Sequence, residues 1–319
     1  MKKLILASFI FAFTAQAATL KLGVLAPEGT SWANSLKQMA KDVETKTSGR
    51  IQFKTYLGGS QGDESDVLKK IRIGQLHGGF FTGKTLGEIQ SDVRVMELPF
   101  TFGADNKKAM AALDRVEKTL AKNFEKSQLK CLGLYGLGFV YFVSQKKFTD
   151  LESLKGVKIW TWEGDKISGT MIDKLHFASV PLSLPDVLSS LSTGMLNATY
   201  APPMAIVALQ WNSKVKYLLD YPLAYAVGAF LVDQKEWNKL SSQDQKILQD
   251  SAQATMKKIT ADNEKENLDA LNSMKGQGIE FIRLPEKDIK NAAQIRNQVV
   301  EQLKGNFLSP SALKLVEGK

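Results

Sequence analysis

The segment that most closely matches a known chemical motif is residues 78–85. It reads Gly-Gly-Phe-Phe-Thr-Gly-Lys-Thr and fits the phosphate-binding P-loop pattern G-x-x-x-x-G-K-[ST]. In a P-loop, an apolar strand precedes the first glycine, so that backbone N–H groups surround the phosphates at the start of a helix. Here residues 71–77 resemble a helix end and a turn, and the apolar residues lie inside the match. We therefore expect a turn after a short strand, and a P-loop nucleotide-binding protein is kept only as an alternative.

Other residues that could carry chemistry are sparse. The two histidines, His77 and His176, are roughly 100 residues apart, which is not the spacing of a metal-ligand pair. The single cysteine, Cys131, lies in an apolar run and is interpreted as a core residue. A G-x-S-x-G nucleophile elbow is absent, and Gly136-Leu137-Gly138 lacks the third glycine of a dinucleotide fingerprint. The sequence therefore predicts no enzyme, no metal site and no cofactor.

The first 17 residues have the pattern of a secretory signal. Lys2 and Lys3 are followed by an apolar stretch and by Ala15-Gln16-Ala17, a small-x-small cleavage site. The apolar stretch is too short to span a bilayer, which needs roughly 20 residues. Since no cysteine follows the cleavage point, we expect a soluble periplasmic protein with a cleaved signal peptide and no lipid anchor.

The charge pattern argues against a nucleic-acid-binding protein. The formal net charge is +9, and two of these charges leave with the signal. Lys and Arg are interleaved with Asp and Glu along the chain, and no arginine-rich run occurs. This distribution is typical of a solvated surface rather than of a basic footprint for phosphates.

Strand-like and helix-like segments alternate along the mature chain. Apolar residues alternate in 19–25 and in 51–55, whereas between them residues 32–43 show helical spacing. The same succession recurs further on, with a strand at 157–162 and a helix at 164–175. This order predicts α/β lobes with largely parallel sheets.

Two long segments could connect such lobes. Residues 129–144 form an apolar run with three glycines, which is either two strands or one strand that crosses between lobes. Residues 243–275 have helical composition without Pro or Gly. A helix of that length extends about 50 Å at 1.5 Å per residue, enough to brace two lobes. No flexible linker is visible, so we expect the crossings to be ordered segments that act as hinges.

An ordered set of motifs resembles one protein family. The motifs are Gly49-Arg50-Ile51, Gly58-Gly59-Ser60-Gln61-Gly62, Leu98-Pro99-Phe100-Thr101-Phe102, Leu154-Lys155-Gly156-Val157-Lys158-Ile159 and the stretch 191–202. Together they resemble the solute-binding proteins of TRAP (tripartite ATP-independent periplasmic) transporters. A binding protein of ABC type shares the general architecture, but the ordered motifs fit the TRAP family better.

The resemblance implies two α/β lobes of the periplasmic binding protein fold, hinge strands, a cleft between the lobes and a long bridging helix. It also implies delivery of a small ligand to TRAP membrane permease subunits. The expected organisation is a signal peptide at 1–17, lobe I at 18–142 with 225–255, lobe II at 143–224 with 276–319, and a bridging part of the long helix at 256–275.

The resemblance also implies how the ligand is held. In most members an organic acid is gripped by an Arg in the strand after Leu-Lys-Gly, helped by a second Arg upstream and an Asn before a Pro. This sequence has Trp160, Val140 and Ala201 at those positions. A desolvated anion without a charged partner costs several kcal/mol, and these residues offer only one indole N–H. We therefore expect a hydrophobic or amphipathic ligand, such as a fatty acid or another lipid.

Residues next to these positions complete the predicted ligand-binding site, namely Phe81, Thr82, Phe139, Trp162, Leu184 and Tyr200. The alternatives are an organic-acid-binding TRAP protein with a non-standard anion site and a pure interaction protein with a collapsed cleft. TRAP binding proteins partnered by tetratricopeptide-repeat proteins resemble this case, because they also lack the carboxylate Arg. Such a repeat protein is thus an additional expected partner.

Overall fold

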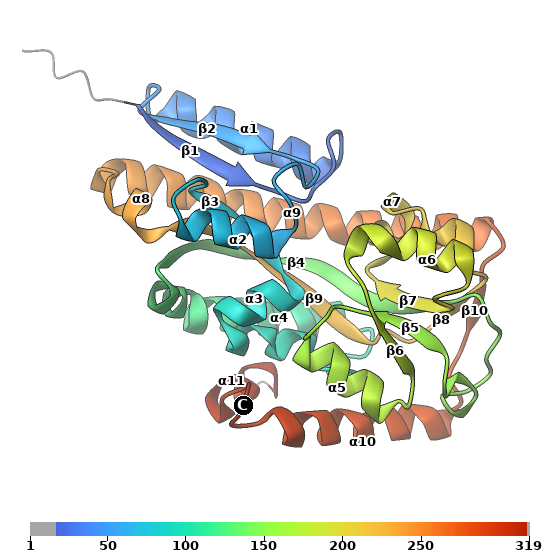
Figure 1. The fold of residues 1–319 in the computed structure, drawn as a ribbon. Coiled ribbons are helices and arrows are strands. Elements are labelled where there is room, and N and C mark those ends of the chain that lie inside the picture. The colour runs from blue at the N-terminus through green and yellow to red at the C-terminus, as the bar shows by residue number, and fades with distance from the viewer. Residues whose placement is uncertain (1–16, 318–319) are drawn as a thin grey trace, which may run out of the picture.

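A computed structural model describes residues 17–317, so the predicted signal sequence lies outside the described residues except for its last position. The sheet of the first lobe has the strand order β2 (Ile51–Tyr56), β1 (Ala18–Gly23), β3 (Gly78–Thr82), β9 (Ala224–Asp233) and β4 (Leu129–Ser144) (Figure 1). Strand β1 is parallel to β2 and β3, whereas β9 is antiparallel to β3 and β4. The lobe is thus a mixed sheet, because β9 runs opposite to the other four strands.

Helices cover both faces of this sheet. They are α1 (Ser31–Lys46), α2 (Glu64–Arg72), α3 (Gly83–Ile89), α4 (Asn106–Leu120), α8 (Gln234–Asn238) and the 3₁₀ helices η1 (Ser91–Glu97) and η2 (Ala121–Ser127). The first of them shows why such segments are helical. The Thr30 hydroxyl caps α1 by accepting a hydrogen bond from the Ala33 amide at 3.2 Å. Leu36, Met39 and Val43 are buried on one face of α1, which packs that face onto the sheet.

The second lobe begins where β4 leaves the first sheet. The end of β4 pairs with β7 (Ala198–Ala201) and β8 (Tyr217–Leu219); β5 (Lys158–Thr161) lies between β7 and β6 (Ala178–Pro181), and β10 (Glu280–Ile282) pairs with β8. The surrounding helices are η3 (Glu152–Leu154), α5 (Lys166–Lys174), η4 (Leu184–Asp186), α6 (Val187–Thr193), α7 (Pro203–Ala208) and η5 (Trp211–Lys214). The apolar run 129–144 is therefore a single strand that belongs to both lobes.

The long helix α9 (Ser242–Gly276) packs against both lobes, as predicted (Figure 1). Its buried residues are mostly apolar where the helix meets each core and mostly polar in between. Leu248 and Ile259 belong to the first-lobe core, Met274 belongs to the second-lobe core, and polar residues are buried between them. This change explains how one helix serves two separate cores without being apolar along a whole face.

The buried polar residues of α9 hold the point where β4 crosses between the lobes. Thr260 Oγ1 accepts a hydrogen bond from the Gly136 amide at 3.0 Å, and Asn263 Nδ2 donates to the Gly136 carbonyl at 2.8 Å. Asn267 Nδ2 donates to the Leu137 carbonyl at 2.8 Å. The β4–β9 register shifts between Gly136 and Gly138, so these bonds satisfy backbone groups that the irregular ladder leaves free.

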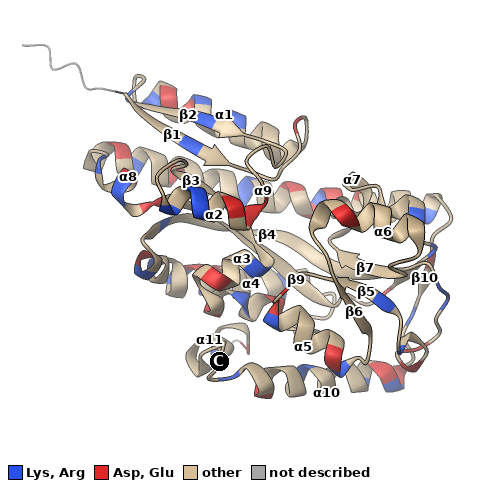
Figure 2. Cartoon of the chain, viewed as in Figure 1, with Lys and Arg blue, Asp and Glu red and all other residues tan. Residues whose placement is uncertain are grey.

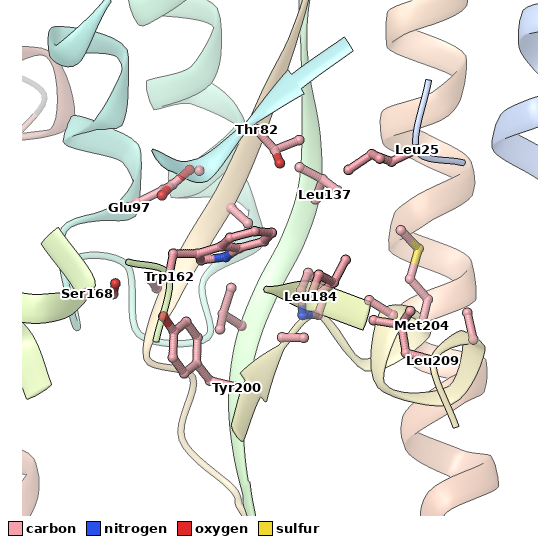
Figure 3. Close-up of a pocket in the computed structure, with 18 of the residues that line it drawn as sticks. Leu25, Thr82, Glu97, Leu137, Trp162, Ser168, Leu184, Tyr200, Met204 and Leu209 are labelled. Carbon is pink, nitrogen blue, oxygen red and sulfur yellow. The ribbon is translucent and has the colours of Figure 1, made fainter. Parts of the chain in front are cut away.

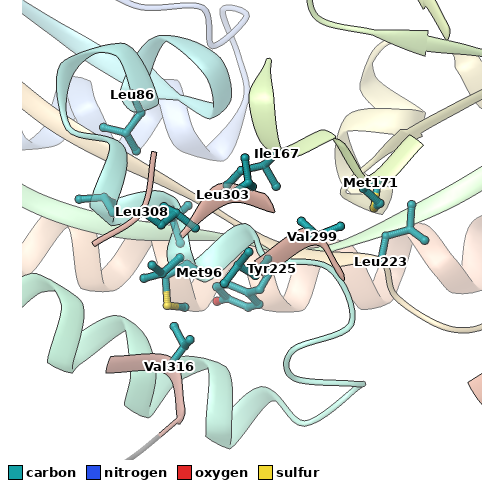
Figure 4. Packing of buried hydrophobic residues seen from close by; sticks show 14 of the residues in the cluster. Leu86, Met96, Ile167, Met171, Leu223, Tyr225, Val299, Leu303, Leu308 and Val316 are labelled. Carbon is teal, nitrogen blue, oxygen red and sulfur yellow. The ribbon is translucent and has the colours of Figure 1, made fainter. Parts of the chain in front are cut away.

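The C-terminal helices link the lobes on another side of the molecule. Helix α10 (Glu286–Leu303) packs on α5, and α11 (Pro310–Glu317) packs on α4 and η1. Their apolar residues join one continuous core with residues of both lobes (Figure 4). On the surface, charges of both signs are intermingled (Figure 2). Among residues 17–317, none of the helices has the combination of length and apolar content needed to cross a membrane.

Candidate functional site

A cavity of about 330 Å³ lies between the two lobes. Its walls come from loops and helices of the first lobe, from β4, from α9 and from the strands of the second lobe (Figure 3). In the part of the wall that the second lobe contributes, Trp160 packs against three other aromatic rings. Its centroid lies 5.0 Å from that of Trp162, 5.4 Å from that of Tyr200 and 5.5 Å from that of Trp211.

The three positions expected to lack an anion clamp all line this cavity. Trp160, Val140 and Ala201 are each at most 8% exposed. Trp160 Nε1 donates a hydrogen bond to the Leu182 carbonyl at 3.0 Å. The indole N–H is therefore already used inside the protein, and these three side chains present only apolar or aromatic surface to the cavity.

Four further predicted site residues also line the cavity, namely Thr82, Trp162, Leu184 and Tyr200. Phe81 and Phe139 do not. Phe81 is fully buried in the core, and the Phe139 ring packs edge-on against Tyr225 with centroids 5.2 Å apart. The prediction that Phe81 and Phe139 line the cavity is therefore wrong, and strand geometry gives the reason. Successive strand residues point to opposite faces, and their neighbours Thr82 and Val140 are the ones that face the cavity.

Sequence reasoning missed an arginine in the cavity wall. Arg94 on η1 is buried, with its guanidinium between two carboxylates. Glu97 Oε2 accepts hydrogen bonds from Arg94 Nε at 2.8 Å and Nη2 at 2.6 Å. Asp165 accepts from Nη1 at 3.1 Å and from Nη2 at 3.0 Å. Arg94 and Glu97 are three residues apart on one helix turn, which a sequence can signal, but Asp165 is distant in sequence and only the fold brings it there.

The two carboxylates are held differently. Asp165 Oδ1 also caps α5, because it accepts hydrogen bonds from the Ile167 and Ser168 amides at 2.9 and 3.2 Å. Glu97 Oε1, in contrast, is buried and has no hydrogen-bond partner among the described residues. Burial raises the pKa of Glu97, and Arg94 opposes this shift. The Val227 amide also lowers this pKa, although it does not complete a hydrogen bond to Oε1.

Glu64 of α2 is a second buried acid in the cavity wall. Thr82 donates to it twice, from its amide to Oε2 and from its hydroxyl to Oε1, both at 2.7 Å. Burial nevertheless raises the pKa of Glu64 to about 8, and the charges of Asp63 and Glu97 add to the shift. Burial therefore favours the protonated form of Glu64.

A comparison of the whole chain with known protein families identifies its family. The model described as "Bacterial extracellular solute-binding protein, family 7" matches residues 22–306. The chain belongs to this family. This chain is 22% identical over 301 residues to the sialic acid-binding periplasmic protein SiaP of Vibrio cholerae. The alignment covers 94% of this chain and 92% of SiaP. The chain is 21% identical over 273 residues to a solute-binding protein of Verminephrobacter eiseniae, covering 85% of this chain and 81% of that one.

Solved structures confirm the two-lobed periplasmic binding protein fold. A TRAP periplasmic solute-binding protein of Desulfovibrio salexigens with bound orotic acid matches with a TM-score of 0.84 at 20% identity, covering 94% of this chain and 96% of that chain. DctP7 of Bordetella pertussis, which binds pyroglutamic acid, matches with a TM-score of 0.86 at 15% identity, covering 94% and 99%. The family match over residues 22–306, together with this fold, confirms the predicted TRAP family. The protein is a TRAP-type periplasmic solute-binding component of transport, and a small-molecule ligand and a membrane permease fit that family.

The P-loop match in this solute-binding protein does not form a phosphate-binding loop. The first five residues of the match are strand β3, and α3 begins at Gly83. Lys84 Nζ lies 3.3 Å from Glu88 Oε1 on the same helix. The motif therefore spans a strand and a helix start, as the position of its apolar residues indicates.

The two histidines lie in a turn and after a helix end, and the cysteine lies in the core. His77 Nδ1 lies 2.9 Å from the Thr19 carbonyl, and His176 has a left-handed φ of 57° just after α5. Cys131 is buried, and burial raises the pKa of its thiol to about 12. Within residues 17–317, His, Cys, Asp and Glu side chains form no cluster of three that could hold a metal ion.

Proposed function

We propose that this protein captures a hydrophobic or amphipathic small ligand, such as a fatty acid or another lipid, in the interlobe cavity and presents it to a TRAP membrane permease. The observation that carries the proposal is the chemistry of Trp160, Val140 and Ala201, which line the cavity without a free hydrogen-bond donor. A ligand carboxylate at these positions would have no charge-assisted partner. An apolar ligand surface there would replace water against aromatic and aliphatic walls.

The size of the cavity is compatible with useful affinity. Burial of about 300 Å² of apolar ligand surface contributes roughly 7 kcal/mol gross at ~25 cal/mol per Å², before the cost of association. Closure of the hinge is needed for this burial, because the walls come from both lobes. A ligand that touches both walls favours the closed form by its extra contacts there.

The moving units in this proposal follow the division expected from the sequence, residues 18–142 with 225–255 against residues 143–224 with 276–319. The crossing of β4 and the α9 contacts to Gly136 and Leu137 supply a hinge between them. Helix α11 is the exception within 276–319, because it packs on α4 of the first lobe and would follow that lobe during closure.

An organic-acid ligand is the second candidate function, and Arg94 is the observation that favours it. Its guanidinium lines the cavity, and structurally similar proteins hold orotic acid and pyroglutamic acid. A two-point grip on an acid would have to displace Asp165 or Glu97 from Arg94, since the two carboxylates already accept hydrogen bonds from all three of its nitrogens. That exchange breaks buried ion pairs, which is why the apolar ligand is preferred here.

Tryptophan fluorescence offers a direct test, because Trp160 and Trp162 line the cavity. We expect 1-octanol to change the emission saturably and to raise the melting temperature, and succinate to do neither. Saturable binding of succinate without binding of octanol would favour the organic-acid function. Loss of the octanol response in Trp160→Ala, with no loss in the distant Trp237→Phe control, would place the binding in the cavity.

A periplasmic tetratricopeptide-repeat protein as an additional partner stays a prediction that rests on the resemblance described above. Co-purification of tagged protein from periplasmic extracts, with and without mild crosslinking, tests it. Recovery of permease subunits alone would count against the repeat protein.

A further inference from the structure

Three buried charged groups of the cavity wall, Arg94, Glu97 and Asp165, lie together at one end. In Figure 3, Glu97, Ser168 and the Tyr200 hydroxyl lie at one side of the cavity, whereas Leu137, Leu184, Met204 and Leu209 lie at the other. The cavity is thus amphipathic, with an apolar end and a polar end. A ligand that fills the cavity therefore contacts polar groups at one end and apolar side chains at the other.

The polar end carries an excess of negative charge. Arg94 is the one Lys or Arg among the lining residues of the described chain, and it faces both Glu97 and Asp165. One positive and two negative groups leave one negative charge uncompensated in a buried place, which is unfavourable without a further partner.

Several polar atoms at this end also lack a hydrogen-bond partner in the described protein. They are Glu97 Oε1, Ser168 Oγ and the Tyr200 hydroxyl oxygen, all of them buried. Ser168 and Tyr200 are close to each other, yet neither hydroxyl completes a hydrogen bond with the other in this structure. Buried polar groups are normally paired, and a missing partner is a mark of a site that something else completes.

Aromatic rings stand next to these atoms. Trp162 and Tyr200 both pack on Trp160 and line the cavity, and Trp162 lies between Glu97 and Tyr200 in Figure 3. The faces of Trp and Tyr rings attract cations through their quadrupole, and ammonium groups are recognised in this way. A carboxylate in the wall beside such rings adds direct charge attraction.

We propose that the ligand carries an ammonium group, which binds at the Glu97–Trp162–Tyr200 end while its apolar part fills the Leu137–Leu184 end. This inference rests on the proposed function and narrows it, because it excludes the fatty acids that an apolar cavity alone would accept. A carboxylate at this end would meet the excess negative charge and an arginine that is already paired.

Three ligands with one tail and different head groups test the proposal, namely n-octylammonium, 1-octanol and octanoate, by calorimetric titration at pH 7. We expect n-octylammonium to bind about tenfold or more tighter than 1-octanol, and octanoate to bind weakest. Glu97→Gln should reduce the ammonium preference to less than about threefold. Glu117→Gln is the matched control, because Glu117 is a partly buried acid that accepts a bond from the Leu134 amide outside the cavity.

The outcomes separate this inference from the proposed function. Equal binding of all three ligands, or tightest binding of 1-octanol, overturns the ammonium site and leaves the apolar cavity intact. Tightest binding of octanoate overturns the ammonium site but agrees with the proposed function, whereas no binding of any of the three overturns both. If Glu97→Gln does not fold, Tyr200→Phe provides a second variant, since it removes one unpartnered hydroxyl and keeps the ring; an unchanged preference in both variants would also overturn the inference.

Discussion

Arg94 of the first lobe and Asp165 of the second form a two-point ion pair across the interlobe boundary, with Nη1–Oδ1 at 3.1 Å and Nη2–Oδ2 at 3.0 Å. Both side chains are only 3% exposed. The pair therefore ties η1 to the start of α5 directly beside the cavity. It is a contact between the lobes that needs no ligand.

Substitutions of Asp165 and of Arg94 should lower the free energy of unfolding by different amounts. Asp165→Asn keeps an N-cap for α5 and leaves Arg94 paired with Glu97, so we expect a loss of about 1–2 kcal/mol in the free energy of unfolding. Arg94→Met leaves two buried carboxylates without a cation, and we expect a loss of about 3–5 kcal/mol. Urea titrations of both variants measure these losses. Equal losses would contradict the charge arrangement described here.

The interlobe ion pair should also affect closure. Without ligand, Asp165→Asn should populate open forms more than the parent does, and small-angle X-ray scattering should report a larger radius of gyration. An unchanged radius would show that the other interlobe contacts, such as those of α9, hold the lobes together alone.

Stability should depend on pH through Glu64. The folded-state pKa of about 8 lies above the ordinary value of 4.5, so the folded protein binds this proton more tightly than the unfolded chain. The corresponding stability is present below pH 4.5 and is lost as the pH rises through about 8. Glu64→Gln should therefore match the parent near pH 5 and exceed it near pH 8.5 by on the order of a few kcal/mol. Parallel urea titrations at both pH values measure the difference, and a difference that does not grow with pH would contradict the assignment.

Trp160→Arg should convert the character of the cavity at some cost in stability. The substitution removes the centre of the aromatic cluster and the bond to the Leu182 carbonyl, so we expect a loss of about 3–5 kcal/mol in the free energy of unfolding. Binding of 1-octanol should weaken by about tenfold or more, and succinate should gain measurable binding. Trp160→Phe is the control that keeps an aromatic ring. Identical ligand-dependent melting curves for Trp160→Arg and the parent would show that Trp160 does not contact the ligand.

The hinge glycine should tolerate no side chain. Gly138 has a φ of +107°, and a Cβ there would lie 2.3 Å from Asn267 Nδ2. Gly138→Ala should cost about 2 kcal/mol or more, through backbone strain and through displacement of Asn267 from the Leu137 carbonyl. Gly169→Ala in α5 is a matched control with open space around its Cβ position, and it should stabilise by about 0.5–1 kcal/mol. Thermal unfolding of the two variants is the measurement, and similar melting temperatures would contradict this account of the hinge.

The sequence predicted those features that depend on local pattern. The run 243–275 and its lack of Pro and Gly correspond to α9, and the apolar run 129–144 corresponds to β4. Trp160 could be placed in the cavity wall because the motif before it fixes its position in β5. Each of these features depends on residues that are adjacent in the sequence.

Other features depend on contacts that no local pattern reveals. Phe139 was expected in the cavity, but the bulge between Gly136 and Gly138 sets which face of β4 each residue occupies. The pairing of Arg94 with Asp165 requires η1 and the start of α5 to meet, which is a consequence of how the two lobes pack together. The acidic end of the cavity follows from that contact, so it could not be found before the fold was known.

The most direct test of an apolar cavity without an anion clamp is the identity of the compound that the native protein carries. Mass spectrometry of the protein purified from the periplasm, before and after extraction with organic solvent, measures it. We predict a bound compound with a substantial hydrocarbon part and no carboxylate contact to Arg94. Recovery of a small polar carboxylic acid, whose retention is abolished in Arg94→Lys, would contradict this account.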